Sequence, residues 1–193
     1  MPADGSESVK QLDPRSLKAL AHPLRVRLLA LLRLDGPATS TGLARRLDET
    51  TGATSYHLRQ LARHGFVEEV EGRGTARERW WRASHQSTRW STADFLGDPG
   101  SAEAADFLLR SQLENEVRQT QRWLAGQAEW PREWVEASEA ADYVLRLTPD
   151  RLRAMADEVE AVVERYREEG RSEPGGERVV AYFRAFPRSD VTP

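Results

Sequence analysis

One segment, residues 49–70, limits most strongly what this chain can fold into. Its sequence is ETTGATSYHLRQLARHGFVEEV. Thr50 is a typical N-cap residue, and it precedes a helix that we expect over residues 51–64. The inner face of that helix consists of residues three or four apart: Thr54, Leu58 and Leu61. Gly65 has the position at which helices end, and Phe66–Val70 is typical of a short strand, so the segment predicts an amphipathic helix followed directly by a strand.

Three further helices are expected before this segment. Asp13-Pro14 combines an N-cap residue with a proline at the first helical position, which predicts a short helix over Pro14–Ala21. Pro23 begins a second helix, which Asp35-Gly36-Pro37 ends. Thr39 is the expected N-cap of a third helix. The expected inner residues are Leu24, Leu28, Leu31 and Leu32 in the second helix, and Leu43, Ala44 and Leu47 in the third.

Two short β-like runs follow the last of these helices. Phe66–Val70 and Arg77–Ala83 flank Glu71–Ala76, a glycine-containing stretch that predicts a hairpin. Short helices followed directly by a hairpin are typical of a winged helix-turn-helix, in which the last helix enters the major groove of DNA. We therefore predict such a domain over residues 13–87. The polar residues 1–12 are expected to be disordered.

The outer face of the helix over residues 51–64 carries small and hydroxyl side chains instead of a row of arginines. Gly52 has no side chain, so the helix start can approach the groove closely, and its free N–H groups favour phosphate. The residues expected to read or contact DNA from this helix are Thr51, Gly52, Ser55, Tyr56, Arg59 and Arg63. Those expected to contact the DNA backbone from the preceding helix and the wing are Thr39, Arg45, Arg46, Arg73 and Arg77. The alternatives are a solvated helix surface and, for Arg73, a solvated hairpin tip, whereas His57 is expected to be structural.

The charge of the chain is divided unevenly between its two halves. The formal net charge is −3 over 193 residues. Residues 1–87 hold 14 Arg or Lys against 10 Asp or Glu, which gives +4, and residues 88–193 hold 14 against 21, which gives −7. The acidity of the whole chain therefore comes from its second half, and the first half is compatible with an anionic partner.

The first half resembles the ArsR-type winged helix-turn-helix regulators. Residues 20–29, LAHPLRVRLL, look like the opening signature of that family. Leu43-Ala44, residues 55–61 (SYHLRQL) and Gly65-Phe66-Val67 match its middle, and Arg73-Gly74 matches its wing. The resemblance covers about residues 14–84 and implies a dimeric, DNA-binding transcription regulator. The chain has no cysteine, so the cysteine-bearing motif of the family's metal sensors is absent. The longer C-terminal half resembles that of extended family members, which add a second domain.

Residues 88–193 predict a long helix followed by a β–α–β layer, a dimerisation or effector domain. The helix is expected over Ala102–Gln127, and its stripe of residues on one face is Ala105, Leu109, Leu113, Val117, Thr120, Leu124 and Ala128. Tyr143–Leu147 and Arg178–Phe186 are the expected strands. Thr148-Pro149 begins the helix between them, whose expected inner residues are Leu152, Met155, Val159, Val162, Val163 and Tyr166. The stripe of the long helix either packs on its own domain or forms a two-fold dimer seam, and we expect both uses.

The C-terminal half is also rich in aromatic residues, namely Trp123, Trp130, Trp134, Tyr143, Tyr166, Tyr182, Phe183 and Phe186. Such residues form the core of a small β–α–β layer, which we favour, or line a pocket for a small apolar effector.

The expected fold is mainly α with a small β content. The expected function is that of a sequence-specific, DNA-binding transcriptional regulator, specifically a repressor. It would act on double-stranded DNA as a homodimer, with two recognition helices about 34 Å apart on a two-fold operator. The alternative is a winged-helix protein-interaction module that docks a partner of the transcription machinery.

Other classes of protein are not favoured by the sequence. It contains no catalytic constellation, metal motif or phosphate-binding loop, so we expect no enzyme, no catalytic or metal site and no cofactor. The longest apolar run, residues 28–32, is far shorter than a membrane span, and the N-terminus lacks the pattern of a signal peptide. A cytoplasmic protein is expected.

Overall fold

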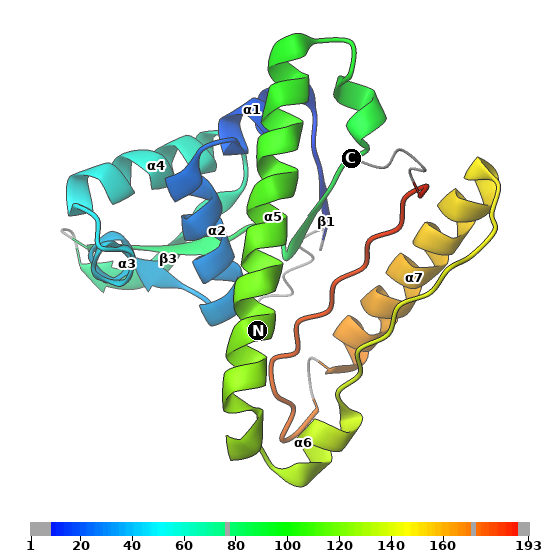
Figure 1. Ribbon diagram of the computed structural model, residues 1–193. Helices are drawn as coiled ribbons and strands as arrows, with labels where there is room; N and C mark the ends of the chain where they lie inside the picture. Colours follow the sequence, from blue (N-terminus) through cyan, green and yellow to red (C-terminus); the bar gives the residue numbers. More distant parts are fainter. Residues whose placement is uncertain (1–8, 76–77, 171–172, 189–193) are drawn as a thin grey trace. The chain divides into compact units, whose positions relative to one another are not determined.

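The computed structural model describes residues 9–75, 78–170 and 173–188, without the side chains of residues 73–78. The contacts divide the chain into two compact units, Met1–Thr120 and Gln121–Pro193. Figure 1 shows the elements of both units. The predicted boundary after residue 87 lies inside the first unit, because the start of the long helix packs on the hydrophobic core of that unit.

Four short helices make up most of the first unit: α1 (Pro14–Leu20), α2 (Pro23–Asp35), α3 (Ser40–Leu47) and α4 (Thr51–Arg63). Their starts confirm the predicted caps. The Asp13 carboxylate accepts a hydrogen bond from the Ser16 amide at 2.7 Å. The hydroxyl oxygens of Thr39 and Thr50 accept from the amides three residues later, both at 3.1 Å. Each such cap stabilises its helix by about 1 kcal/mol, so these polar residues fix where the helices begin.

The end of α4 also follows from the sequence. Gly65 has a φ of 68°, a left-handed conformation that glycine adopts without steric cost. Its amide donates to the Ala62 carbonyl at 2.9 Å, and the Phe66 amide donates to the Leu61 carbonyl at 3.0 Å. This pair of bonds is a Schellman motif, which ends the helix and turns the chain into the following strand.

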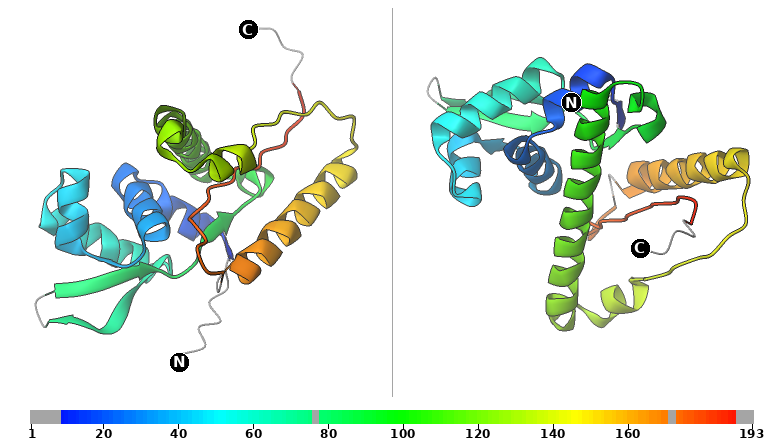
Figure 2. Two further views of the ribbon diagram at one scale, coloured as in Figure 1. Left: turned by 90° about the horizontal axis from the view of Figure 1, so that it is seen from below. Right: turned by 45° about the horizontal axis from the view of Figure 1, so that its top comes forward.

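The hairpin is longer than its sequence predicts. Strand β3 (Val67–Thr75) pairs antiparallel with β4 (Glu78–Ala83), and β2 (Ala38–Thr39) pairs with the other side of β4, so the strand order is β2-β4-β3. Residues 71–75, expected in the loop, therefore lie in the strand. The register shifts between Glu69 and Gly74, and Gly72 within that interval has a φ of 70°. A bulge thus accommodates the glycines while the strands continue. Figure 2 shows the hairpin as a long ribbon on one side of the helices.

The prediction that residues 1–12 are disordered is wrong for residues 9–12. Val9–Gln11 form strand β1, which pairs in parallel with β5 (Ser87–Arg89). Leu12 is buried, with 4% of its surface exposed, and its amide donates to the Arg89 carbonyl at 3.0 Å. The polar composition of residues 1–12 gave no indication that Leu12 is buried or that a strand far away in the sequence, β5, pairs with residues 9–11. Residues 1–8 lie outside the described residues.

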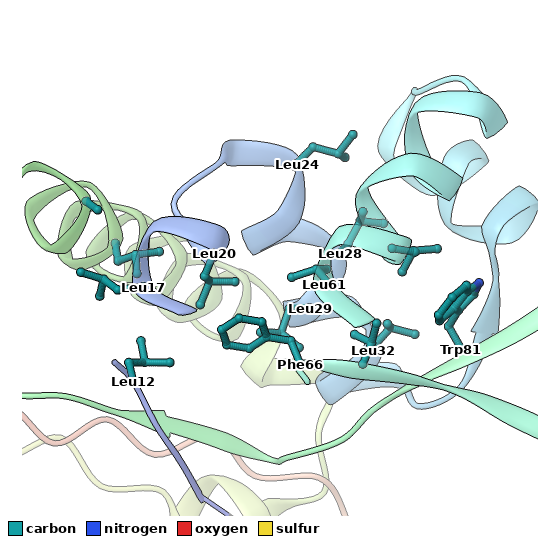
Figure 3. Close-up of a cluster of buried hydrophobic side chains, with 14 of the residues drawn as sticks. Leu12, Leu17, Leu20, Leu24, Leu28, Leu29, Leu32, Leu61, Phe66 and Trp81 are labelled. Carbon is teal, nitrogen blue, oxygen red and sulfur yellow. The ribbon is translucent and has the colours of Figure 1, made fainter. Parts of the chain in front are cut away.

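One hydrophobic core holds the first unit together (Figure 3). The predicted inner face of α4 is confirmed, since Thr54, Leu58 and Leu61 are fully buried. In α2 the buried face is Leu24, Leu28, Leu29 and Leu32, whereas Leu31 is partly buried. Phe66, Trp81 and Phe95 close the core from the hairpin and from the 3-10 turn at Thr92–Phe95. The core fixes the position of α4 and leaves its opposite face exposed.

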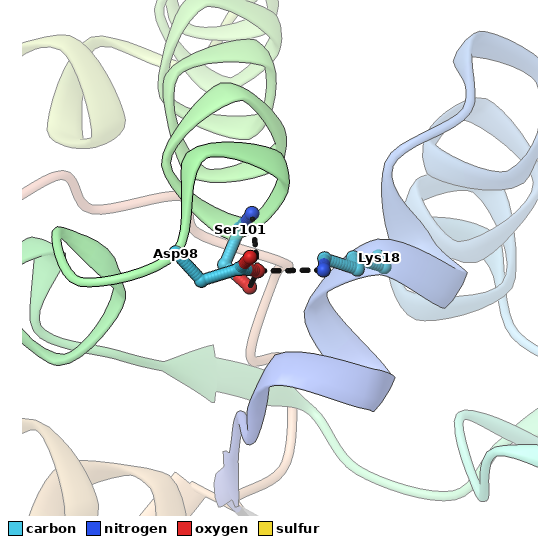
Figure 4. Close-up of polar contacts among 3 residues, drawn as sticks. All are labelled: Lys18, Asp98 and Ser101. Atoms are coloured by element: carbon cyan, nitrogen blue, oxygen red, sulfur yellow. Dashed lines mark hydrogen bonds and ion pairs between the residues drawn. The ribbon is translucent and has the colours of Figure 1, made fainter.

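Helix α5 (Pro99–Gly126) is the predicted long helix and begins three residues earlier than expected. The Asp98 carboxylate caps it, accepting from the amide and the hydroxyl of Ser101 at 3.0 and 2.6 Å (Figure 4). Lys18 of α1 donates to the same oxygen at 2.6 Å. These bonds hold the pKa of Asp98 at about 2, with the Lys18 hydrogen bond as the largest cause. One carboxylate therefore joins the start of α5 to α1.

The predicted stripe of α5 has two different environments. The first turns pack on the core through Ser101, Ala104, Ala105 and Leu108. Farther along the helix Leu113, Val117 and Leu124 are exposed, with 45%, 53% and 59% of their surface accessible.

The predicted β–α–β layer is wrong. The second unit contains the 3-10 turn Gln127–Glu129, α6 (Arg132–Ala137) and α7 (Pro149–Gly170). Tyr143–Leu147 and Arg178–Phe186 have no strand structure, because no backbone ladder pairs them. The start of α7 is as expected, since the Arg151 amide donates to the Thr148 hydroxyl at 3.3 Å. No residue of α7 is buried, so its expected inner residues do not form a core within one chain.

The aromatic residues of the second unit do not form the favoured core either. Tyr143, Tyr166, Tyr182, Phe183 and Phe186 are all exposed. Trp130 lies between Trp123 and Trp134, with ring centroids 6.2 and 6.0 Å apart. Within the described residues, neither of the two alternating segments pairs with a strand.

Candidate nucleic-acid interface

The exposed face of α4 carries the residues that the sequence indicated. Thr51, Gly52, Tyr56, Arg59 and Arg63 are exposed, and Ser55 is half-buried. Tyr56 exposes 53% of its surface. The structure thus brings all six predicted α4 residues to one side of the core.

The start of α4 leaves space for a close approach. A Cβ added to Gly52 meets no atom within 4 Å, so nothing in the described part of the chain requires a glycine there. The first amides of a helix have no acceptor within the helix, and at α4 the Thr50 hydroxyl satisfies only that of Ala53. The remaining donors and the positive end of the helix dipole favour an anion.

The arginines near α4 differ in how available they are. Arg63 and Arg45 are exposed, whereas Arg59 donates through Nε to the Ser55 carbonyl at 3.2 Å on its own helix. Arg46 forms an ion pair with Asp35 at 2.6 Å. A phosphate would have to compete with Asp35 for Arg46, so Arg45 and Arg63 are the better backbone contacts.

Thr39 is placed differently from the other predicted contacts. It is buried, with 8% of its surface exposed, and its hydroxyl caps α3 through the Gly42 amide. Its placement favours this structural task over contact with DNA.

The structure describes only part of the predicted wing. Arg77 and the side chain of Arg73 lie outside the described residues. On the described hairpin, Arg82 pairs with Glu68 at 2.6 Å and Arg79 with Glu69 at 3.2 Å. The sequence alone does not predict these cross-strand pairs, because the register of the two strands depends on the bulge.

A second group of residues, which the sequence analysis did not select as a site, lies where α2 meets α4. The rings of His22 and His57 contact each other, with their centroids 4.3 Å apart and their planes tilted by 34°. The Leu24 amide donates to His22 Nδ1 at 3.2 Å, which makes His22 the N-cap of α2. Burial lowers the pKa of both histidines, and nearby Arg25 lowers it further. A neutral imidazole pair therefore joins the two helices at neutral pH.

The described residues show two further properties. They contain no cluster of three or more His, Cys, Asp or Glu residues that could hold a metal ion. Among their helices, none has a stretch of the length and apolar character that crossing a membrane requires.

Comparisons with known proteins point to the same region. Residues 20–70 match a family model described as a helix-turn-helix domain, which here covers α2, α3, α4 and the start of β3. No curated protein gives a significant match.

Several solved structures are similar in part. HlyU from Vibrio cholerae is 26% identical over 52% of this chain and 90% of its own, with a TM-score of 0.33. A mutant of ZitR from Lactococcus lactis in its apo form is 12% identical over 79% and 83%, with a TM-score of 0.30. Transcriptional regulator PA4135 is 15% identical over 65% and 90%, with a TM-score of 0.33. These TM-scores are too low to support an argument, and the family match stands by itself: residues 20–70 form a helix-turn-helix domain.

Proposed function

We propose that the protein is a sequence-specific, DNA-binding transcription regulator, and more narrowly a repressor of the ArsR type. One observation carries the proposal: a helix-turn-helix domain holds α4 by its buried face and leaves six potential DNA contacts, five of them exposed and Ser55 half-buried, on the other.

In this proposal α4 lies in the major groove with its first turn nearest the bases. Small side chains at Gly52 and Ser55 permit close approach, and Thr51, Ser55 and Tyr56 contact base edges or thymine methyl groups. Arg45 and Arg63 contact phosphates on either side and set the register. The groove is read by hydroxyl and aromatic groups, while the arginines supply affinity that depends on salt.

We further propose that two copies bind together and that α5 and the second unit form the dimerisation and effector part. Leu113, Val117 and Leu124 remain exposed along α5, and exposed apolar residues recur through the second unit. Large exposed apolar patches on a monomer are typical of a surface that a partner covers. A small apolar effector would bind among its aromatic side chains.

The function is tested by selecting bound fragments from sheared genomic DNA, followed by footprinting. We expect short protected sites with two-fold symmetry, lost steeply as salt is raised. A fragment pool without any enriched site, together with a stoichiometric protein partner that survives nuclease treatment, would contradict the proposal and support the protein-docking alternative.

A further inference from the structure

Arg25 occupies an unusual position at the start of α2. It lies in the first turn, three residues after the N-cap His22, and is half-buried. No hydrogen bond or ion pair from its guanidinium is found within the described part of the chain, and its Nε is buried without an acceptor. Burial lowers the pKa of Arg25, while nearby Tyr56 acts in the opposite direction. A half-buried cation with unused hydrogen-bond donors is unfavourable unless a binding partner supplies acceptors for them.

Three other arginines of α2 and α3 each have at least one acceptor, although the Nη2 of Arg33 is buried without one. Arg27 donates to the Leu47 carbonyl at 3.2 Å, Arg33 to the His85 carbonyl at 2.9 Å, and Arg46 pairs with Asp35. These contacts tie helices, turns and strands to one another. Arg25 differs because it makes no such contact within the described part of the chain, although it lies close to the same core.

Arg25 lies one turn after His22, so both residues belong to the side of α2 that meets α4. The His22 ring contacts that of His57, and the His57 ring contacts that of Tyr56 edge-on, with centroids 5.1 Å apart. Arg25 is close enough to Tyr56 for the phenol to influence its pKa. A single row of rings therefore connects the N-cap of α2 to the most exposed aromatic side chain of the recognition helix, with Arg25 beside it.

We propose that Arg25 binds a phosphate of the DNA backbone beside α4, so that α2 contributes a contact outside the recognition helix. The inference rests on the proposed function. The ligand is a phosphodiester oxygen, which matches the forked guanidinium donors. The His22–His57 pair is the positioning element, because it fixes the first turn of α2 relative to Tyr56.

The test is the salt dependence of binding to a random-sequence DNA duplex, since phosphate contacts do not depend on sequence. We compare the full-length protein with Arg25→Gln and with Arg151→Gln, a charge-matched control at an exposed position of α7. For each copy bound, Arg25→Gln should reduce the slope of log K against log salt by about 0.9. Arg151→Gln should leave the slope unchanged, and Arg25→Lys should retain it because the charge remains.

The outcomes separate this inference from the function on which it rests. If the unmodified protein binds duplex DNA and Arg25→Gln has the same slope, the phosphate contact is refuted while the proposed function stands. If the unmodified protein does not bind duplex DNA at all, both fall. If Arg25→Gln perturbs folding, Arg25→Met takes its place in the test, because methionine keeps the apolar stem. Arg25→Met should show the same loss of slope.

Discussion

At the scale of single residues, Gly52 is a position at which one substitution should change stability and DNA affinity in opposite directions. Since a Cβ at this position meets no atom within 4 Å, the fold alone has no use for glycine in a helix. We predict that Gly52→Ala stabilises the protein by up to about 1 kcal/mol, because alanine loses less backbone entropy in a helix. The same methyl group should weaken binding to a selected DNA site, because it stands where α4 approaches the groove.

Thermal unfolding and DNA titration measure the two effects on the same sample. Gly126→Ala is the matched control, since an added Cβ at that position also meets nothing within 4 Å. It should leave the affinity for DNA unchanged. Equal DNA affinity of Gly52→Ala and the unmodified protein would contradict close approach of the helix start.

The His22–His57 pair makes stability depend on pH. Burial is the largest cause that lowers both pKa values from 6.5. Arg25 lowers both further, His22 also lowers that of His57, and Glu49 acts in the opposite direction. As the pH falls below 6.5, the unfolded chain therefore binds protons before the folded one does. Stability should be full above this pH and decrease as the pH falls toward the folded-state values. His57→Phe, which keeps a ring but cannot be protonated, should lose less in melting temperature over this range.

The control for this prediction is His64→Phe, at the residue that follows α4 and lies outside the ring pair. It should retain the pH dependence of the unmodified protein. An unchanged profile for His57→Phe would show that the pair does not couple protonation to folding.

At the scale of elements, Asp98 fixes the start of α5 and joins it to α1. Its pKa of about 2 lies below the ordinary 3.8, so the folded state releases this proton more readily than the unfolded chain. The contribution of Asp98 to stability should be complete above pH 3.8 and be lost as the pH falls toward 2. Asp98→Asn should thus be less stable than the unmodified protein near neutral pH and equally stable at the acidic end.

Denaturant unfolding at several pH values tests the role of Asp98. Asp106→Asn in the same helix removes a carboxylate that pairs only with Arg110, one turn away. Asp106, unlike Asp98, caps no helix start, and an exposed ion pair by itself contributes little, so this control should hardly differ from the unmodified protein. A constant deficit of Asp98→Asn at all pH values would refute the charge-dependent link.

The elements that the sequence predicted well are those with local signals. Asp13, Thr39 and Thr50 specify where helices start, and Gly65 specifies where α4 ends; each acts on amides or carbonyls within a few residues. The α4 face was predictable for the same reason, since helical periodicity places Thr54 and its neighbours inward.

The features that the sequence did not reveal depend on distant partners. Strand β1 exists because it pairs with β5, some eighty positions along the chain, and no local pattern marks it. The length of the hairpin depends on a bulge, and the role of Arg25 depends on the packing of α2 on α4. The two predicted strands of the second unit are not formed, because an alternating pattern of apolar residues cannot form a sheet without a second strand.

At the scale of the whole molecule, the exposed part of the α5 stripe predicts assembly. The combined change Leu113→Lys and Val117→Lys should convert a dimer into a monomer, because two charges cannot be buried in an apolar seam. Light scattering after size exclusion measures the mass directly. Glu114→Lys, between these positions on the helix, is the control and should remain dimeric. An unmodified protein of monomer mass would contradict the dimer proposal.

The central claim is that α4 reads DNA sequence through Ser55 and Tyr56, and competition binding tests it most directly. The unmodified protein and the double variant Ser55→Ala, Tyr56→Ala are titrated with a selected site and with a scrambled duplex of the same composition. We predict that the double variant loses its preference for the selected site and retains its salt-dependent affinity for the scrambled duplex. If the affinities for both duplexes fall by the same factor, α4 holds DNA without reading it, and the claim is contradicted.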